Sequence, residues 1–168
     1  MAEELHLTAS ETVTVVRAEP EALEVEGTYG PKGSPPPKHF HPDQDESFRI
    51  ISGQLMTKVD DVERELGEGD TLEIPRGAVH QMWNASDTDA RVWWRTSPAG
   101  RTEDWFRAVD SLQSEAGEGE PSPLAFGVLL REYDDTFRLA VGPKAASGPL
   151  AFALGALGRL RGHRVPDA

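Results

Sequence analysis

The chain has 168 residues, of which 29 are acidic and 17 are basic, so its formal net charge is −12. This excess of negative charge repels phosphate backbones and argues against a nucleic-acid partner. Cysteine is absent, which excludes disulfides, a thiol nucleophile and thiolate metal ligands. The first residues do not form a signal-peptide pattern, and the longest apolar stretch, Pro149–Leu157, is too short to span a bilayer. We therefore expect a cytoplasmic protein that does not bind a membrane.

Short β-strands separated by Gly, Pro and Asp are predicted over the first hundred residues. In Glu21–Tyr29, for example, Leu23 and Val25 alternate with Glu24 and Glu26. Short strands at such regular spacing are typical of an all-β barrel or sandwich. The predicted strands are Glu11–Val16, Glu21–Tyr29, Glu46–Ile51, Gln54–Val59, Val62–Leu66, Asp70–Pro75, Ala78–Trp83 and Ala90–Thr96.

The hydrophobic period changes after Pro98, which divides the chain into a barrel domain at residues 1–98 and a helical extension at 99–168. Acidic residues follow Thr102, and apolar residues then recur at helical spacing. We therefore expect a first helix with Thr102 as its N-cap.

Two further helices are predicted in the extension. Ser122 and Pro123 are the residue types preferred at the N-cap and the first helical position, and Phe137 is expected on the buried side of the helix that they open. The last helix is expected from Pro149 to about Arg161. Both should pack on the barrel or on a partner subunit.

Two histidines and a glutamate lie close together in the segment Lys38–Phe48. His39 and His41 are two residues apart, so in a strand they point to the same face, and Glu46 can return beside them on the next strand. His80 is a fourth candidate. Three imidazoles and one carboxylate suit a borderline divalent metal, and an ion that prefers six ligands would keep two positions open. Zinc would more often be four- or five-coordinate.

The spacing of these residues resembles the two sequence motifs of the cupin family. The first motif is Gly, five residues, His-x-His, three or four residues, Glu, six residues and Gly, and here it runs from Gly33 to Gly53. The second is Gly, five residues, Pro-x-Gly, two residues, His, three residues and Asn, and here it runs from Gly69 to Asn84. Every position of both motifs is filled.

This resemblance implies a double-stranded β-helix, or jelly-roll, barrel with added C-terminal helices. It implies one divalent metal ion, of Fe, Mn, Ni, Co or Zn, held inside the barrel by His39, His41, Glu46 and His80. It also suggests a homodimer. Asn84 is expected to fix a loop rather than to touch substrate.

Apolar residues on the same faces as the ligands predict a pocket next to the metal. Phe48 shares a face with Glu46, Met82 shares one with His80, and Met56 on the next strand is a third candidate. Barrels also fill their interiors with apolar side chains, so a purely structural role for these three residues stays open.

The function expected from the resemblance is a metal-dependent dioxygenase that acts on a small organic substrate, with aromatic compounds as one candidate class and with Glu46 doubling as a base. A non-catalytic cupin that binds a small molecule is the alternative. A sugar isomerase or epimerase is less favoured, because such pockets recruit basic residues for phosphate and only Lys58 is a candidate.

Overall fold

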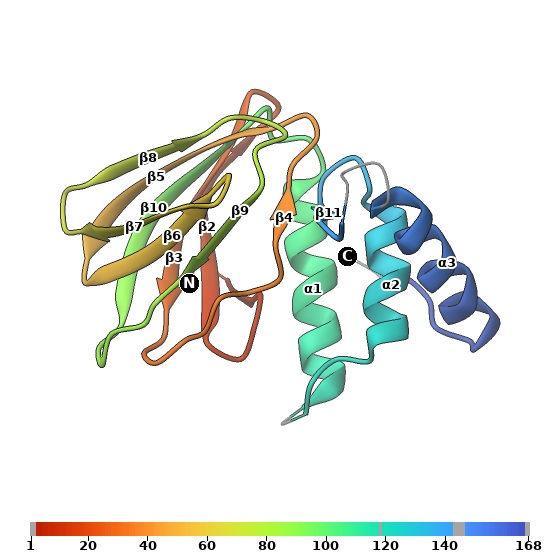
Figure 1. The fold of residues 1–168 in the computed structure, drawn as a ribbon. Coiled ribbons are helices and arrows are strands. Elements are labelled where there is room, and N and C mark those ends of the chain that lie inside the picture. The colour runs from red at the N-terminus through yellow and green to blue at the C-terminus, as the bar shows by residue number, and fades with distance from the viewer. Residues whose placement is uncertain (1–2, 118, 143–146, 167–168) are drawn as a thin grey trace.

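The computed structural model describes residues 3–117, 119–142 and 147–166 of the chain. Within these ranges the strands form two antiparallel sheets that face each other as a barrel (Figure 1). The order of the larger sheet is β1-β2-β3-β10-β5-β8, and that of the smaller sheet is β11-β4-β9-β6-β7. The strands are β1 (Glu4–His6), β2 (Glu11–Glu19), β3 (Ala22–Tyr29), β4 (His39–Phe40), β5 (Asp45–Ser52), β6 (Gln54–Val59), β7 (Val62–Gly67), β8 (Thr71–Ile74), β9 (His80–Trp83), β10 (Ala90–Ser97) and β11 (Arg138–Leu139).

The predicted barrel with C-terminal helices is confirmed, and alternation along the strands explains its core. In β10, Val92 and Trp94 are buried while Trp93 between them points outward. Val92 lies opposite Ile50 and Trp94 opposite Phe48 on the neighbouring strand β5, so the four side chains build one apolar layer. Burying large apolar side chains in this way is the main force that stabilises the sheet pair.

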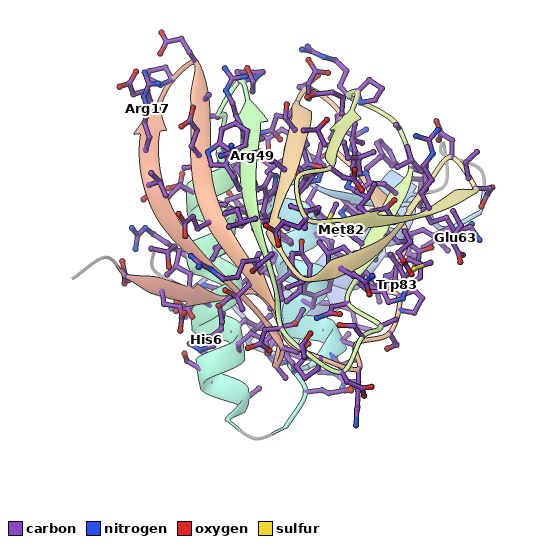
Figure 2. The ribbon with its side chains drawn as sticks, turned by 90° about the vertical axis from the view of Figure 1, so that its left-hand side faces the viewer. His6, Arg17, Arg49, Glu63, Met82 and Trp83 are labelled. Atoms are coloured by element: carbon purple, nitrogen blue, oxygen red, sulfur yellow. The ribbon has the colours of Figure 1, made fainter. Side chains whose placement is uncertain are left out.

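The outer faces of the sheets carry charged side chains. Arg17 and Arg49 on the larger sheet are exposed, as is Glu63 on β7, the edge strand of the smaller sheet (Figure 2). A charged residue on an edge strand disfavours pairing with another sheet.

Motif residues outside the ligand set have structural roles. Gly53 adopts a φ of 79°, and a Cβ there would lie 2.6 Å from the carbonyl oxygen of Asp89, so only glycine fits this turn. The Asn84 side chain is buried and donates hydrogen bonds to the carbonyl oxygens of Tyr29 and Thr88. It fixes the loop before β10, as expected.

Three helices follow the barrel in the described part of the chain: α1 (Thr102–Ala116), α2 (Pro123–Glu132) and α3 (Ser147–Leu160). Helix α1 lies against the barrel, α2 lies beside α1, and α3 is outermost (Figure 1). The side chains Trp105, Phe106 and Val109 of α1 are buried in the same core as the sheet residues. None of the helices described is long and apolar enough to cross a membrane.

Two local expectations for the extension were wrong. Arg101 is the N-cap of α1, and Thr102 is its first helical residue, whose hydroxyl accepts a hydrogen bond from Gln44. Helix α2 starts as predicted, with Ser122 before Pro123, but it ends at Glu132. Phe137 therefore lies beyond the helix, in the turn that leads into β11.

Candidate metal centre

The fold brings the three predicted histidines together at the neighbouring strands β4 and β9 of the smaller sheet. His39 opens β4, His41 follows directly after this strand, and His80 opens the neighbouring strand β9, where it pairs with His39. One ring nitrogen from each histidine lies within 4.8 Å of those of the other two. Such a spacing allows the three imidazoles to share one ion.

Backbone carbonyl groups orient all three rings. The Nδ1 atom of each histidine lies within hydrogen-bond distance of a carbonyl oxygen: Pro37 for His39 (3.2 Å), Thr136 for His41 (2.7 Å) and Ala78 for His80 (3.1 Å). When Nδ1–H donates to these oxygens, Nε2 keeps its lone pair free to bind a metal.

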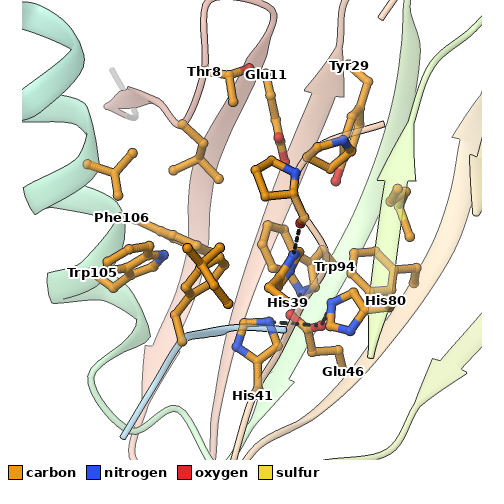
Figure 3. Close-up of a pocket in the computed structure, with 18 of the residues that line it drawn as sticks. Thr8, Glu11, Tyr29, His39, His41, Glu46, His80, Trp94, Trp105 and Phe106 are labelled. Atoms are coloured by element: carbon orange, nitrogen blue, oxygen red, sulfur yellow. Dashed lines mark hydrogen bonds and ion pairs between the residues drawn. The ribbon is translucent and has the colours of Figure 1, made fainter. Parts of the chain in front are cut away.

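Glu46 reaches the histidines from β5 in the opposite sheet. Its Oε2 atom lies 3.4 Å from Nε2 of His41 and 3.1 Å from Nε2 of His80 (Figure 3). The other oxygen, Oε1, accepts a hydrogen bond of 3.0 Å from Nε1 of Trp94. Glu46 is only 1% exposed, and neither its Oε2 nor the buried Nε2 of His41 has a well-formed hydrogen bond to any described residue. Buried polar atoms rarely stay unsatisfied, and a cation between these two would satisfy both.

The electrostatics of the cluster favour a cation. Burial lowers the pKa of His39 and of His41, so both rings are neutral, which is the form that binds metals. Burial would raise the pKa of Glu46, but its interactions with His41 and His80, including a hydrogen-bond contact with His80, outweigh burial and lower the pKa to about 2. Burial also lowers the pKa of His80, but the contact with Glu46 reverses this effect and raises it. Three imidazoles and one carboxylate fit a divalent ion in chemistry and in position.

A cavity of about 180 Å³ adjoins the cluster, and the four candidate ligands lie in its wall together with Phe48 and Met82. Met56 does not reach it. The register of β6 places Thr57 opposite Met82 and Met56 opposite Trp83, so Met56 points to the other face of the sheet. Strand alternation placed the small polar Thr57 inward instead of the apolar residue beside it.

Several residues in the cavity wall were not predicted. Trp94 could have been predicted from alternation along its strand. Thr96 pairs with Glu46, and Trp94, two residues earlier, points to the same face as Thr96. Trp105 and Phe106 come from α1, and no local pattern shows that this helix faces the barrel interior.

Phe137 connects the helical extension directly to a candidate metal ligand. Its ring stacks on His39 at 4.5 Å between centroids and on Trp105 at 4.8 Å. The next residues form β11, in which Leu139 pairs with His39, and Thr136 supplies the carbonyl that orients His41. The division at residue 98 stays a prediction, but the candidate centre draws on both sides of it.

Glu11 and Tyr29 also line the cavity and were not predicted. They are opposite residues on β2 and β3. Burial raises the pKa of Glu11 to about 7, although a hydrogen bond with Tyr29 acts in the opposite direction. Burial and the nearby Glu11 carboxyl raise the pKa of Tyr29 well above its ordinary value.

Comparison with known proteins agrees with this architecture. Residues 25–95 match the family model of the cupin domain. An oxidoreductase, iacF, from Pestalotiopsis fici is 32% identical over 107 residues, which are 58% of this chain and 52% of that protein. Quercetin 2,3-dioxygenase from Bacillus subtilis is 29% identical over 106 residues, which are 62% of this chain and 31% of that protein. The chain thus spans about half or less of the length of these curated relatives.

Solved structures share the fold at low sequence identity. KdgF from Halomonas sp. superposes with a TM-score of 0.55 at 18% identity, over 60% of this chain and 92% of that one. An RmlC-like cupin from Shewanella frigidimarina gives a TM-score of 0.54 at 19% identity, over 61% of this chain and 89% of that one. With both motifs filled, a two-sheet barrel and a family model that matches residues 25–95, this part of the chain is a cupin domain.

Proposed function

We propose that this cupin is a metal-dependent oxidoreductase of the dioxygenase type that acts on a small aromatic substrate. The observation that carries the proposal is the position of a buried three-histidine, one-glutamate cluster in the wall of an aromatic-lined cavity. The oxidoreductase names of two relatives support the reaction class.

The residues that would hold the ion are His39, His41, His80 and Glu46. The buried Nε2 of His41 and Oε2 of Glu46, which lack a well-formed hydrogen bond to any described residue, support this assignment. Its identity, among Fe, Mn, Ni, Co and Zn, stays open. When bound, a divalent ion supplies Lewis acidity that polarises a substrate oxygen.

The protein itself would bind and orient the substrate. Phe48, Trp94 and Phe106 give the cavity aromatic walls, which hold a planar ring and exclude water. Glu46 faces the same cavity, so we assign it the acceptance of a proton from a substrate hydroxyl. A phenolic or catecholic hydroxyl suits this role better than an aliphatic one, because it is the more acidic of the two.

Phosphorylated sugars fit this cavity poorly. Among the described residues, its wall contains no lysine or arginine, and Lys58 lies outside it. This argues against the isomerase alternative. A small-molecule partner follows from the cavity, whereas the homodimer, the cytoplasmic location and the lack of nucleic-acid or membrane partners remain expectations from composition and resemblance.

The experiment that tests this function loads the purified protein with Fe(II), Mn(II), Ni(II) or Co(II) and follows oxygen uptake with catechols and flavonols. We expect at least one pairing to turn over. His41→Ala should lose both metal retention and oxygen uptake, because it removes a ligand. His6→Ala is the matched control, since His6 is an exposed residue that contacts Asp110 and is not part of the cavity wall.

If the fully loaded protein shows no oxygen uptake with any combination of metal and substrate, the dioxygenase proposal is contradicted. Tight binding of one of these compounds without turnover would instead support the non-catalytic alternative.

A further inference from the structure

The cavity has two polar ends with an apolar middle. His39, His41, Glu46 and His80 form one end. Glu11 and Tyr29 lie on the other side of the pocket, above the rings of Trp94 and Phe106 (Figure 3). A mostly apolar pocket with few polar groups uses those groups to fix the orientation of its ligand.

Glu11 and Tyr29 lie where the cavity meets the protein surface. A groove of about 600 Å³ runs past them, and both residues, together with the proline segment Pro36–Pro37, line the groove as well as the cavity. The groove and the cavity are therefore adjacent at Glu11 and Tyr29.

The size of the cavity limits what can fit between the two ends. An apolar cavity of about 150 Å³ is known to accommodate benzene. At about 180 Å³, this cavity has room for one substituted aromatic ring. A ligand of several rings would have to extend into the groove.

We propose that Glu11 and Tyr29 form a second recognition site, which binds a hydroxyl group on the far side of a single-ring aromatic substrate whose near side faces the candidate metal ligands. The inference rests on the proposed function, because it takes the substrate to be aromatic and to bind at that end.

The chemistry of the pair suits this role. A carboxylate has about four lone-pair sites, so Glu11 has acceptor capacity for a ligand hydroxyl as well as for the hydroxyl of Tyr29. Tyr29 lies opposite Glu11 on the neighbouring strand, so both side chains are available to one ligand group. Because the pKa of Glu11 is about 7, this group is in part ionised at neutral pH and accepts a charge-assisted hydrogen bond.

The test measures binding of redox-stable complexes rather than turnover. Protein loaded with Zn(II) is titrated with four catechols that carry a methyl or a hydroxymethyl group at ring position 3 or 4, and binding is followed by tryptophan fluorescence and calorimetry. At the position that reaches Glu11, we expect the wild-type protein to prefer hydroxymethyl over methyl by about tenfold. Glu11→Leu should abolish this preference, and the isosteric Glu11→Gln and Tyr29→Phe should reduce it.

Glu19→Gln is the matched control, because Glu19 lies on the same strand as Glu11 but is exposed and outside the cavity. It should leave the preference unchanged. If catechols bind but wild type and both Glu11 variants give the same ratio, the second site is overturned and the proposed function survives. If no catechol binds the zinc-loaded protein, both proposals fall.

Discussion

At the scale of single residues, we expect the buried Glu11 carboxyl to make the stability of the protein depend on pH. Its pKa is raised from 4.5 to about 7, chiefly by burial. Since the folded state holds this proton more tightly than the unfolded state, the contribution is fully present below pH 4.5 and is lost as pH rises to about 7. Glutamine does not ionise, so the stability of the wild type relative to Glu11→Gln should fall by at most about 3 kcal/mol between pH 5 and pH 8.

Urea unfolding of the two metal-free proteins across this pH range measures the difference. The proteins must be metal-free because the charge of Glu46 also raises the pKa of Glu11, and an ion would offset that charge. A parallel pH dependence of the two proteins would show that the Glu11 carboxyl is well solvated.

The residues of the candidate centre could be predicted because motif spacing fixes them whatever their surroundings. The prediction that Met56 lines the pocket was wrong because no motif fixes its position. Its assignment rested on being apolar, whereas the register with β9 decides which face it occupies and gives the inward position to Thr57. Glu11 and Tyr29 carried no motif, and only the pairing of β2 with β3 brings them together.

At the scale of elements, the short strand β11 and the turn before it attach the extension to the strand that carries His39. Phe137 lies between His39 and Trp105, so its ring joins a candidate ligand to α1. Phe137→Ala should lower the free energy of unfolding by about 2 kcal/mol, because it leaves a gap between stacked rings. It should also weaken zinc binding by about tenfold, because the support of His39 and the neighbouring Thr136 carbonyl is loosened.

Urea unfolding and competition with a chelator measure these two effects. Phe152→Ala is the matched control. Phe152 lies on α3, is 59% exposed and contacts Arg131 rather than the cavity, so its loss should change stability by no more than about 0.5 kcal/mol and leave zinc affinity unchanged. Equal zinc affinity of the wild type and Phe137→Ala would mean that the extension does not support the centre.

Most strands could be predicted, but the role of the extension could not. The strands of the barrel show a period of two over six or more residues, as in β3 and β10. By contrast, β11 has two residues, and its partner β4 lies about a hundred residues earlier in the chain. No local period marks so short a segment, and its position is set by tertiary packing of α1 and Phe137.

At the scale of the whole molecule, the barrel and α1 share one hydrophobic core. Trp105, Phe106 and Val109 of α1 belong to the same buried cluster as Phe48 and Trp94 of the barrel. Unfolding of α1 would expose the cavity wall, and unfolding of the barrel would expose the apolar face of α1. The two parts are therefore expected to unfold together.

Metal removal tests this coupling, because an ion held by ligands from both sheets binds only the folded state. At a free zinc concentration of one hundred times Kd, binding stabilises the folded state by about 2.7 kcal/mol. For a chain of this length, that corresponds to a rise in Tm of about 5–10 °C. Calorimetry of zinc-loaded and chelator-treated protein should show one transition that shifts as a whole, while the same treatment of His80→Ala should produce almost no shift. Two transitions, only one of which responds to zinc, would show instead that the helical extension unfolds independently of the barrel that its Phe137 and β11 contact.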